Sequence, residues 1–264
     1  MHLRALIFFY FVLFSLQCQS KIGEEQASNA AFKVLALEEI TIDKLHQGYL
    51  TGEFTVSEVV QAYLGRIEAV DHDPSGPALN SVITLNSEAL DIATSMDAQL
   101  MQAKEGMLPP LFGVPVLLKD NIDTKEGMPN TAGARAMAES RPYRDAFIVQ
   151  QLREAGAIIL GKTNLSEWAN FHSSFSSSGW SGLGGQTKNP YDPSRSPCGS
   201  SAGSGVAASA NLAMFTIGTE TNGSITCPAN ANGLVGIKPT VGLLSRSGII
   251  PISYTQDTPG PMTR

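Results

Sequence analysis

The spacing of apolar residues predicts a chain in which helices alternate with short strands. Apolar side chains recur every three or four residues, as in helices with one buried face, in segments 41–52, 55–67, 87–104 and 144–155. Short apolar runs, typical of strands, occur at 81–85, 111–118, 157–160 and 213–218. Strands that alternate with helices predict an α/β fold built around a sheet.

Local signals predict where some helices begin. Thr55 and Glu58 match a capping box, in which the threonine side chain accepts a hydrogen bond from the third helical amide and the glutamate reaches back to the cap. Ser87 is expected to cap the third of the helices above, and Asn164 to cap a further short helix. Loops are expected at 71–77, 127–140 and 173–185.

Glycine and serine gather in two islands, 199–205 and 219–224, on either side of an alanine-rich run. Small residues let the backbone pass close to a ligand and leave amide N–H groups free to point at it. The islands therefore predict a site that handles a developing negative charge. A flexible linker is a poorer interpretation, because Cys198, Cys227 and segment 234–237 have the composition of a buried core.

Two known motifs fit the islands less well. A phosphate-binding loop of the Walker type needs lysine and then serine or threonine after its last glycine, and Gly205 is followed by neither. Residues 199–203 match G-x-S-x-G, but the mechanism of that turn needs a histidine downstream of Ser201. All histidines precede it: His2, His46, His72 and His172.

The first twenty residues differ in character from the rest. Arg4 precedes an apolar run, 5–16, which is too short to cross a bilayer of ~30 Å at ~1.5 Å per residue. We therefore expect residues 1–20 to be a signal peptide and the protein to be exported, as a periplasmic or secreted protein without a membrane span. Cys18 is a candidate lipid anchor of a bacterial lipoprotein, although an incidental cysteine fits equally well. Residues 21–34 form a polar lead, and 35–264 the folded domain.

Charge and cysteine content restrict the partners. A formal net charge of −6, with no cluster of lysine or arginine, argues against nucleic acid. Cys198 and Cys227 are the cysteines that remain after the signal peptide, and both a disulfide and two buried free thiols fit their surroundings. With no CxxC, HExxH or ligand-spaced histidine, neither a metal nor a cofactor is expected.

A hydrolytic serine without a histidine needs another base, and lysine can serve only when its amine is uncharged. Lowering the pKa of a lysine from ~10.4 by ~3 units costs roughly 4 kcal/mol, which burial can supply through desolvation. Lys119 comes directly after the apolar run 111–118, so it is the candidate base. None of the nine lysines has a serine three positions before it, so any Ser–Lys pair must form over a long range.

The sequence resembles the amidase signature enzymes, in three blocks that stand in the family's order. The blocks are GVPVLLKDN at 113–121, SPCGSSAGS at 196–204 and GTETNGSI at 218–225, and the likeness continues through GLVGIKPT at 233–240. The resemblance implies a mixed β-sheet flanked by helices. Because members of the family are much longer, residues 35–264 are expected to be the N-terminal portion of the amidase domain.

The resemblance also implies a Ser–Ser–Lys mechanism that forms an acyl-enzyme with a small or peptide amide. Ser224 matches the nucleophile, Ser200 the bridging serine, which follows a cis peptide bond, and Lys119 the base. The family's oxyanion pocket maps onto the backbone amides of Thr221, Asn222, Gly223 and Ser224.

The pocket block departs from the usual family pattern in two places. Asn222 replaces the first of two glycines, and Thr226 and Cys227 stand where an arginine is common. These changes resemble the peptide amidase branch more than the related glutaminyl-tRNA amidotransferase, and export also argues against a tRNA-linked role. The alternative hypotheses that remain are a catalytically inert fragment or binding remnant, and an amidotransferase subunit.

Overall fold

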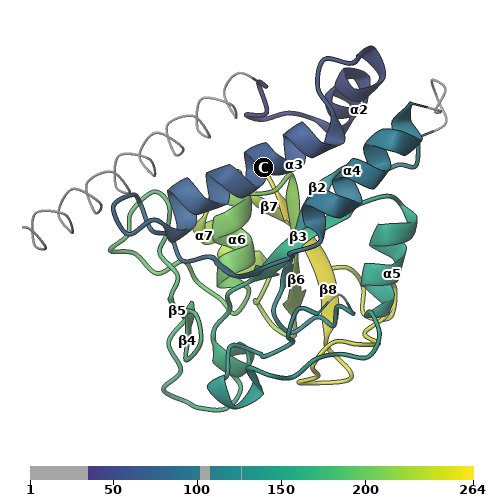
Figure 1. Cartoon of the computed structure of the whole chain (residues 1–264). Coiled ribbons are helices and arrows are strands. Elements are labelled where there is room, and N and C mark those ends of the chain that lie inside the picture. Colours follow the sequence, from purple (N-terminus) through teal and green to yellow (C-terminus); the bar gives the residue numbers. More distant parts are fainter. Residues whose placement is uncertain (1–34, 102–107, 126) are drawn as a thin grey trace, which may run out of the picture.

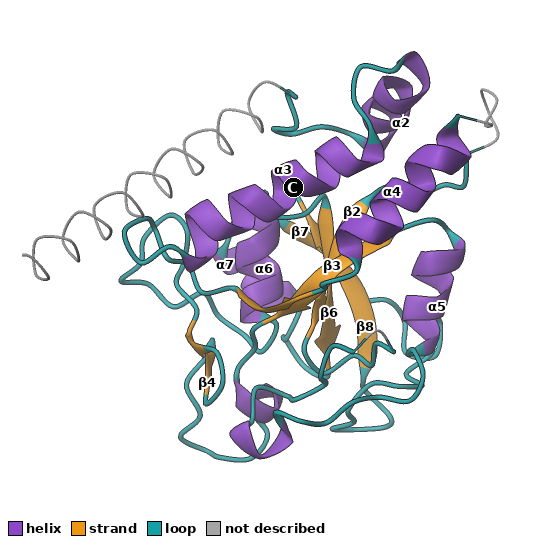
Figure 2. Ribbon diagram, in the orientation of Figure 1, coloured by secondary structure: helices purple, strands orange, loops and turns teal. Residues whose placement is uncertain are grey.

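The computed structural model describes residues 35–101, 108–125 and 127–264. Its centre is a mixed six-stranded sheet in the order β1-β3-β2-β6-β8-β7 (Figures 1 and 2). The strands are β1 (Val82–Leu85), β2 (Pro115–Lys119), β3 (Ile158–Thr163), β6 (Phe215–Glu220), β7 (Val235–Gly236) and β8 (Thr258–Thr263). The mixed sheet flanked by helices confirms the expected fold class.

The three middle strands are parallel and buried. β2 pairs in parallel with both β3 and β6, whereas β1 and β8 run antiparallel to their neighbours. Every residue of β2 and β3 is buried, as continuous apolar runs predict for strands covered on both faces. The carboxyl ends of β2 and β6 therefore meet at one edge of the sheet, where ligands bind in open α/β sheets.

The helices predicted at 41–52 and 55–67 both form. In α2 (Ile42–Thr51), the side chain of Thr41 accepts from the third amide and Gly52 ends the helix in a left-handed conformation. In α3 (Val56–Ile67), Thr55 and Glu58 complete the capping box. α3 and α4 (Ala89–Leu100) pack together over one end of the sheet (Figure 1).

Two helices begin later than the pattern predicts. α4 starts at Ala89, and Ser87 makes no capping bond, because Asn86 Oδ1 instead accepts from the amide of Glu88 at 3.0 Å. The expected end of this helix, in 102–107, lies outside the described residues. α5 (Phe147–Glu154) begins three residues after Arg144 and lies on the opposite side of the sheet from α6 (Ala202–Ser209) and α7 (Thr226–Ala231) (Figure 2).

Short elements complete the described chain. A π-helix spans Glu68–His72, 3-10 turns span Arg135–Met137 and Glu167–Asn170, and a two-stranded sheet joins β4 (Trp180–Ser181) to β5 (Gly185–Gln186). The prediction that 234–237 belongs to a buried core is wrong for Val235 and Ile237, which are 60% and 54% exposed. Val235 lies in β7 and Ile237 directly follows it, and β7 is the edge strand of the sheet, paired with β8.

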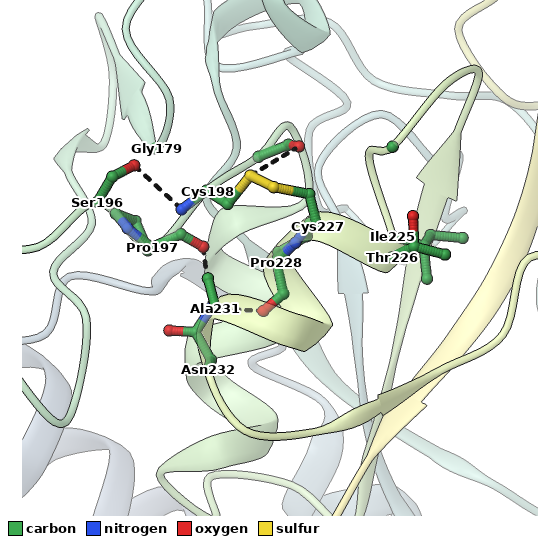
Figure 3. The surroundings of a disulfide bond; sticks show 12 residues. Gly179, Ser196, Pro197, Cys198, Ile225, Thr226, Cys227, Pro228, Ala231 and Asn232 are labelled. Atoms are coloured by element: carbon green, nitrogen blue, oxygen red, sulfur yellow. Dashed lines mark hydrogen bonds between the residues drawn. A yellow bond between two sulfur atoms is a disulfide. The ribbon is translucent and has the colours of Figure 1, made fainter.

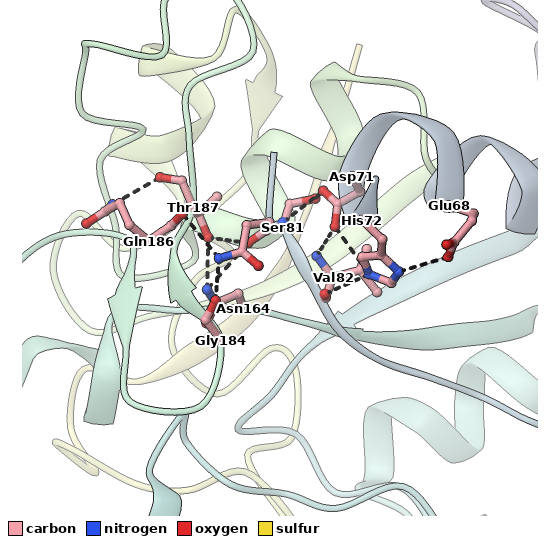
Figure 4. A network of polar contacts seen from close by, with 10 residues as sticks. Glu68, Asp71, His72, Ser81, Val82, Asn164, Gly184, Gln186 and Thr187 are labelled. Carbon is pink, nitrogen blue, oxygen red and sulfur yellow. Dashed lines mark hydrogen bonds and ion pairs between the residues drawn. The ribbon is translucent and has the colours of Figure 1, made fainter. Parts of the chain in front are cut away.

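Asp71 and Asn164 have structural roles that the sequence did not predict (Figure 4). Asp71 was expected in a loop, and Asn164 at a helix cap. Asp71 lies in the π-helix, and its carboxylate is buried. The carboxylate accepts hydrogen bonds from the amides of Ser81 and Val82 at 2.8 and 2.9 Å, which fixes the start of β1. Asn164 caps no helix: it is fully buried and donates to the Gly185 carbonyl and Thr187 hydroxyl, each at 3.1 Å.

Several expectations fall on residues that the structure does not describe. The predicted signal peptide, its candidate lipid anchor and the polar lead all lie in 1–34. Among the described helices, none has the length and apolar character needed to cross a bilayer. In the same part of the chain, no three His, Cys, Asp or Glu side chains are grouped as metal ligands.

Candidate active site

Lys119 contacts Ser200, from the second motif block at 196–204, at the carboxyl edge of the sheet. It is the last residue of β2, and its Nζ lies 2.8 Å from Ser200 Oγ. On the β6 side, Nζ lies 2.9 Å from the Thr219 hydroxyl and 3.2 Å from the Thr219 carbonyl. Asn121 Nδ2 donates to the same Thr219 hydroxyl at 2.9 Å. Two of the three predicted catalytic side chains therefore touch, although 81 positions separate them.

The amine of Lys119 is removed from water. The side chain is fully buried, and this burial lowers the pKa of Lys119 from its ordinary value to about 7. The negative charges of Glu220 and Asp257 oppose the shift, because they favour the ammonium form. A pKa near 7 leaves a substantial neutral fraction at neutral pH, as a lysine base requires.

The two adjacent serines differ in their contacts. Ser200 follows the cis peptide bond Gly199–Ser200, which confirms the expectation from the family resemblance. Ser201, the serine of the G-x-S-x-G match, is fully buried, and its hydroxyl donates to the Thr219 carbonyl at 3.0 Å. Ser201 thus joins the islands together and offers no free hydroxyl for attack.

Ser224 lies beside this pair on a turn that we name the serine turn, residues 221–225. The Ser224 carbonyl accepts from the amide of Ser201 at 3.1 Å, which joins the turn to the segment that carries Ser200. Its side chain is only half-buried, and within the described residues its hydroxyl makes no hydrogen bond. The third predicted catalytic residue is therefore brought to the same edge with its hydroxyl unengaged.

Glu220 holds the serine turn from inside. One carboxylate oxygen accepts from the amide of Gly223 at 2.6 Å, and the other accepts from those of Ile225 and Thr226 at 2.8 and 2.9 Å. Burial alone would raise the pKa of Glu220, but these three amides and the charge of Lys238 together hold it below its usual value.

The same contacts change the expected oxyanion pocket. The Gly223 amide, one of the four predicted donors, is already used by Glu220. Among the described residues, the amides of Asn222 and Ser224 donate to no oxygen. At Gly223 the backbone has φ of 83°, and a Cβ there would meet no atom within 4 Å, so this position opens onto free space.

A disulfide ties the two serine-bearing segments together (Figure 3). Cys198, two residues before Ser200, is bonded to Cys227, three residues after Ser224. The structure thus decides between the two alternatives that the sequence left open. The alternative of buried thiols also fails on exposure, because Cys198 is half-buried and Cys227 exposed.

Removing this disulfide is expected to destabilise the protein. The bond joins residues 29 positions apart, so the double variant Cys198→Ala/Cys227→Ala should lose about 3.6 kcal/mol of unfolding free energy. Urea denaturation with and without dithiothreitol measures the loss. The reductant should destabilise the wild-type chain and leave the double variant unchanged, whereas equal sensitivity of both proteins would contradict the assignment.

Lys162 is a second fully buried lysine, but its partners differ. Its Nζ donates to the carbonyls of Ile122 and Pro129 at 2.5 and 3.4 Å and lies 3.6 Å from Asp120 Oδ1. Burial lowers the pKa of Lys162, and the Asp120 charge opposes that shift. Because Lys162 contacts carbonyls and a carboxylate and not a serine hydroxyl, it supports the segment behind Lys119 as a structural ion pair.

Sequence reasoning missed the residues that support the site. Three of them lie inside the quoted motif blocks: Asn121, Thr219 and Glu220. Glu220 stands four positions before Ser224, and an acidic residue at that position could have indicated a turn whose backbone amides need an acceptor. Lys238 stands in the quoted stretch 233–240, but nothing local links it to the serine turn, which it reaches over 17 positions. Asp257 lies outside every quoted stretch and reaches the turn over 36 positions.

Comparisons with known proteins show which family the chain belongs to. A family profile described as Amidase matches residues 58–264. A probable amidase of Arabidopsis thaliana is 45% identical over 229 residues, covering 87% of this chain and 44% of that protein. A glutamyl-tRNA(Gln) amidotransferase subunit from Alkaliphilus metalliredigens is 42% identical over 231 residues, with the same coverage of 87% and 44%.

Among solved structures, native peptide amidase from Stenotrophomonas maltophilia is 54% identical, with a TM-score of 0.81 over 86% of this chain and 45% of that one. The names of these relatives all refer to chemistry on amides. The chain belongs to the amidase signature family. It spans less than half the length of the relatives it matches, 44% and 45%.

Proposed function

We propose that the protein hydrolyses amides through an acyl-enzyme on Ser224, with Ser200 as the proton relay and Lys119 as the base. The observation that carries this proposal is the 2.8 Å contact between the Lys119 amine and the Ser200 hydroxyl, at a buried amine whose pKa is lowered to about 7. Family membership supports amide hydrolysis at the coarser level.

The partners of Lys119 fit a neutral amine with two donors and one lone pair. A carbonyl can only accept, so the Thr219 carbonyl takes one N–H, and the Thr219 hydroxyl takes the other. The lone pair then faces Ser200 and can accept its hydroxyl proton. Once Ser200 donates to the amine, its oxygen can accept a proton from Ser224. The proton thereby passes from Ser224 through Ser200 to Lys119.

The reaction then follows the logic of serine hydrolases. Ser224 Oγ attacks the amide carbonyl, and the carbonyl oxygen becomes an oxyanion stabilised by backbone amides of the serine turn. The proton held on Lys119 returns through Ser200 to the leaving nitrogen, so the C–N bond breaks and an ester remains on Ser224. Water, deprotonated along the same route, hydrolyses that ester and releases the acid.

Small and peptide amides are the proposed substrates, by analogy with the peptide amidase to which the chain is similar. Similarity to an amidotransferase component supports a second candidate, in which the same site releases ammonia for a partner. The disulfide next to the catalytic serines favours the first, because disulfides persist in oxidising compartments. We accordingly propose an exported enzyme.

Hydrolysis of a C-terminal peptide amide by the purified chain tests this proposal. We expect ammonia release that is independent of ATP and of any partner protein. A fluorophosphonate probe should label the chain at one site, and peptide mass spectrometry should locate the label on Ser224. A chain that releases no ammonia and takes up no probe would favour the inert alternative, and release that requires added partner proteins would favour the amidotransferase.

A further inference from the structure

The serine turn is held at Thr221 from two sides. Lys238, two residues beyond β7, donates from Nζ to the Thr221 carbonyl at 2.5 Å. The Thr221 hydroxyl donates to Asp257 Oδ1 at 2.5 Å. The second oxygen of Asp257 accepts from the amides of Ile252 and Ser253 at 2.8 and 2.9 Å, so this acceptor is itself fixed. Neither holding group belongs to the three blocks that carry the catalytic residues: Lys238 stands in the following stretch 233–240, and Asp257 lies beyond it.

The carbonyl that Lys238 holds determines the direction of the next amide. In a planar trans peptide, the C=O of one residue and the N–H of the next point in opposite directions. Fixing the Thr221 carbonyl on Lys238 therefore directs the Asn222 N–H away from Lys238. Within the described part of the chain that N–H donates to no oxygen.

The same rule applies two peptides later. The Gly223 carbonyl accepts from the amide of Cys227 at 2.8 Å, so the Ser224 N–H points away from α7. The peptide between them differs, because its Gly223 N–H is bound to Glu220. The serine turn thus keeps two amides, those of Asn222 and Ser224, in fixed directions and without partners among the described residues.

We propose that Lys238 is a positioning residue for amide hydrolysis: by holding the Thr221 carbonyl, it aims the Asn222 N–H at the oxyanion that forms when Ser224 attacks. This inference rests on the proposed function and identifies which donors of the expected pocket do the stabilising. Among the described residues, Lys238 Nζ contacts the Thr221 carbonyl and lies 3.8 Å from Glu220 Oε1, so its proposed action on the reaction is through the serine turn. Its backbone is anchored, because the preceding Ile237 donates its amide to the Pro261 carbonyl of β8 at 3.0 Å.

Lys238→Met tests the inference, since methionine keeps the length of the side chain and removes its donor. Loss of one oxyanion donor lowers kcat by about 10²–10³ in a serine hydrolase, and a misdirected donor should cost about 10- to 100-fold. We expect KM to stay within about twofold, because the amide acts only after attack. Lys238→Arg, which retains a donor, should recover most of the rate, and Lys44→Met, on the exposed face of α2, should change nothing.

Inhibitor binding distinguishes the proposed positioning role of Lys238 from a purely structural one. A peptide aldehyde adds to the serine and carries an oxyanion, so its inhibition constant should weaken with kcat, while that of the carboxylate product should not. Equal weakening of both, or an unchanged kcat, would overturn the inference alone. A wild-type chain that neither turns over a peptide amide nor reacts with fluorophosphonate would overturn the proposed function together with it. Lys238→Leu, which also removes the donor, provides the same comparison if the methionine variant is poorly soluble.

Discussion

Replacing Ser224 with alanine is expected to lower the hydrolysis of a peptide amide by about 10⁴-fold or more, because the oxygen that forms the acyl-enzyme is removed. Fluorophosphonate labelling should disappear completely. The fold should persist, since the Ser224 hydroxyl makes no hydrogen bond within the described residues and only its carbonyl joins the turn to Ser201. Steady-state kinetics, with thermal unfolding measured on the same samples, checks all three outcomes.

Two other serines make the comparison specific. Ser75→Ala, in an exposed loop, should retain full turnover and labelling. Ser201→Ala removes the serine of the alternative G-x-S-x-G motif, whose hydroxyl is committed to the Thr219 carbonyl. This variant should lose stability but still label at Ser224. Labelling that moved to another residue, or persisted in Ser224→Ala, would refute the assignment of the nucleophile.

Elements with a strong local signal could be predicted from the sequence. The capping box of α3 and the apolar run of β2 are decided by neighbouring residues, and both formed as expected. β8 could not be found in this way, because Pro259 and Pro261 cannot donate to a ladder and argue against an interior strand. It forms because pairing with β6 on one side and β7 on the other supplies what local propensity lacks.

In the candidate site too, some residues could be predicted from the local sequence and others depend on long-range contacts. Lys119 was recognisable as a charge at the end of a buried strand, yet Lys162 carries the same signal and became an ion pair. Only the three-dimensional partner separates the two lysines: a serine hydroxyl for one, a carboxylate and two carbonyls for the other. The supporting roles of Lys238 and Asp257 depend on such long-range contacts: the quoted stretch 233–240 contains Lys238 but does not show that it reaches Thr221.

Replacing Lys119 with methionine is expected to lower kcat/KM by about 10⁴-fold, close to the effect of losing the nucleophile, because the members of such a relay act as a unit. KM should change little, since the amine lies behind Ser200 and is fully buried. Lys44→Met, which removes an exposed lysine, is the matched control. Activity within tenfold of the wild type would mean that Ser224 takes its base from elsewhere.

The pH dependence tests the same residue without removing it. The amine accepts a proton only when neutral, so kcat/KM should fall about tenfold per pH unit below the pKa of Lys119, which burial lowers to about 7. Asp257 raises that pKa by its charge. Asp257→Asn removes the charge and keeps one of the two acceptor oxygens, so it should move the acidic limb of the profile to lower pH. A limb that stays in place would show that another group controls the protonation step.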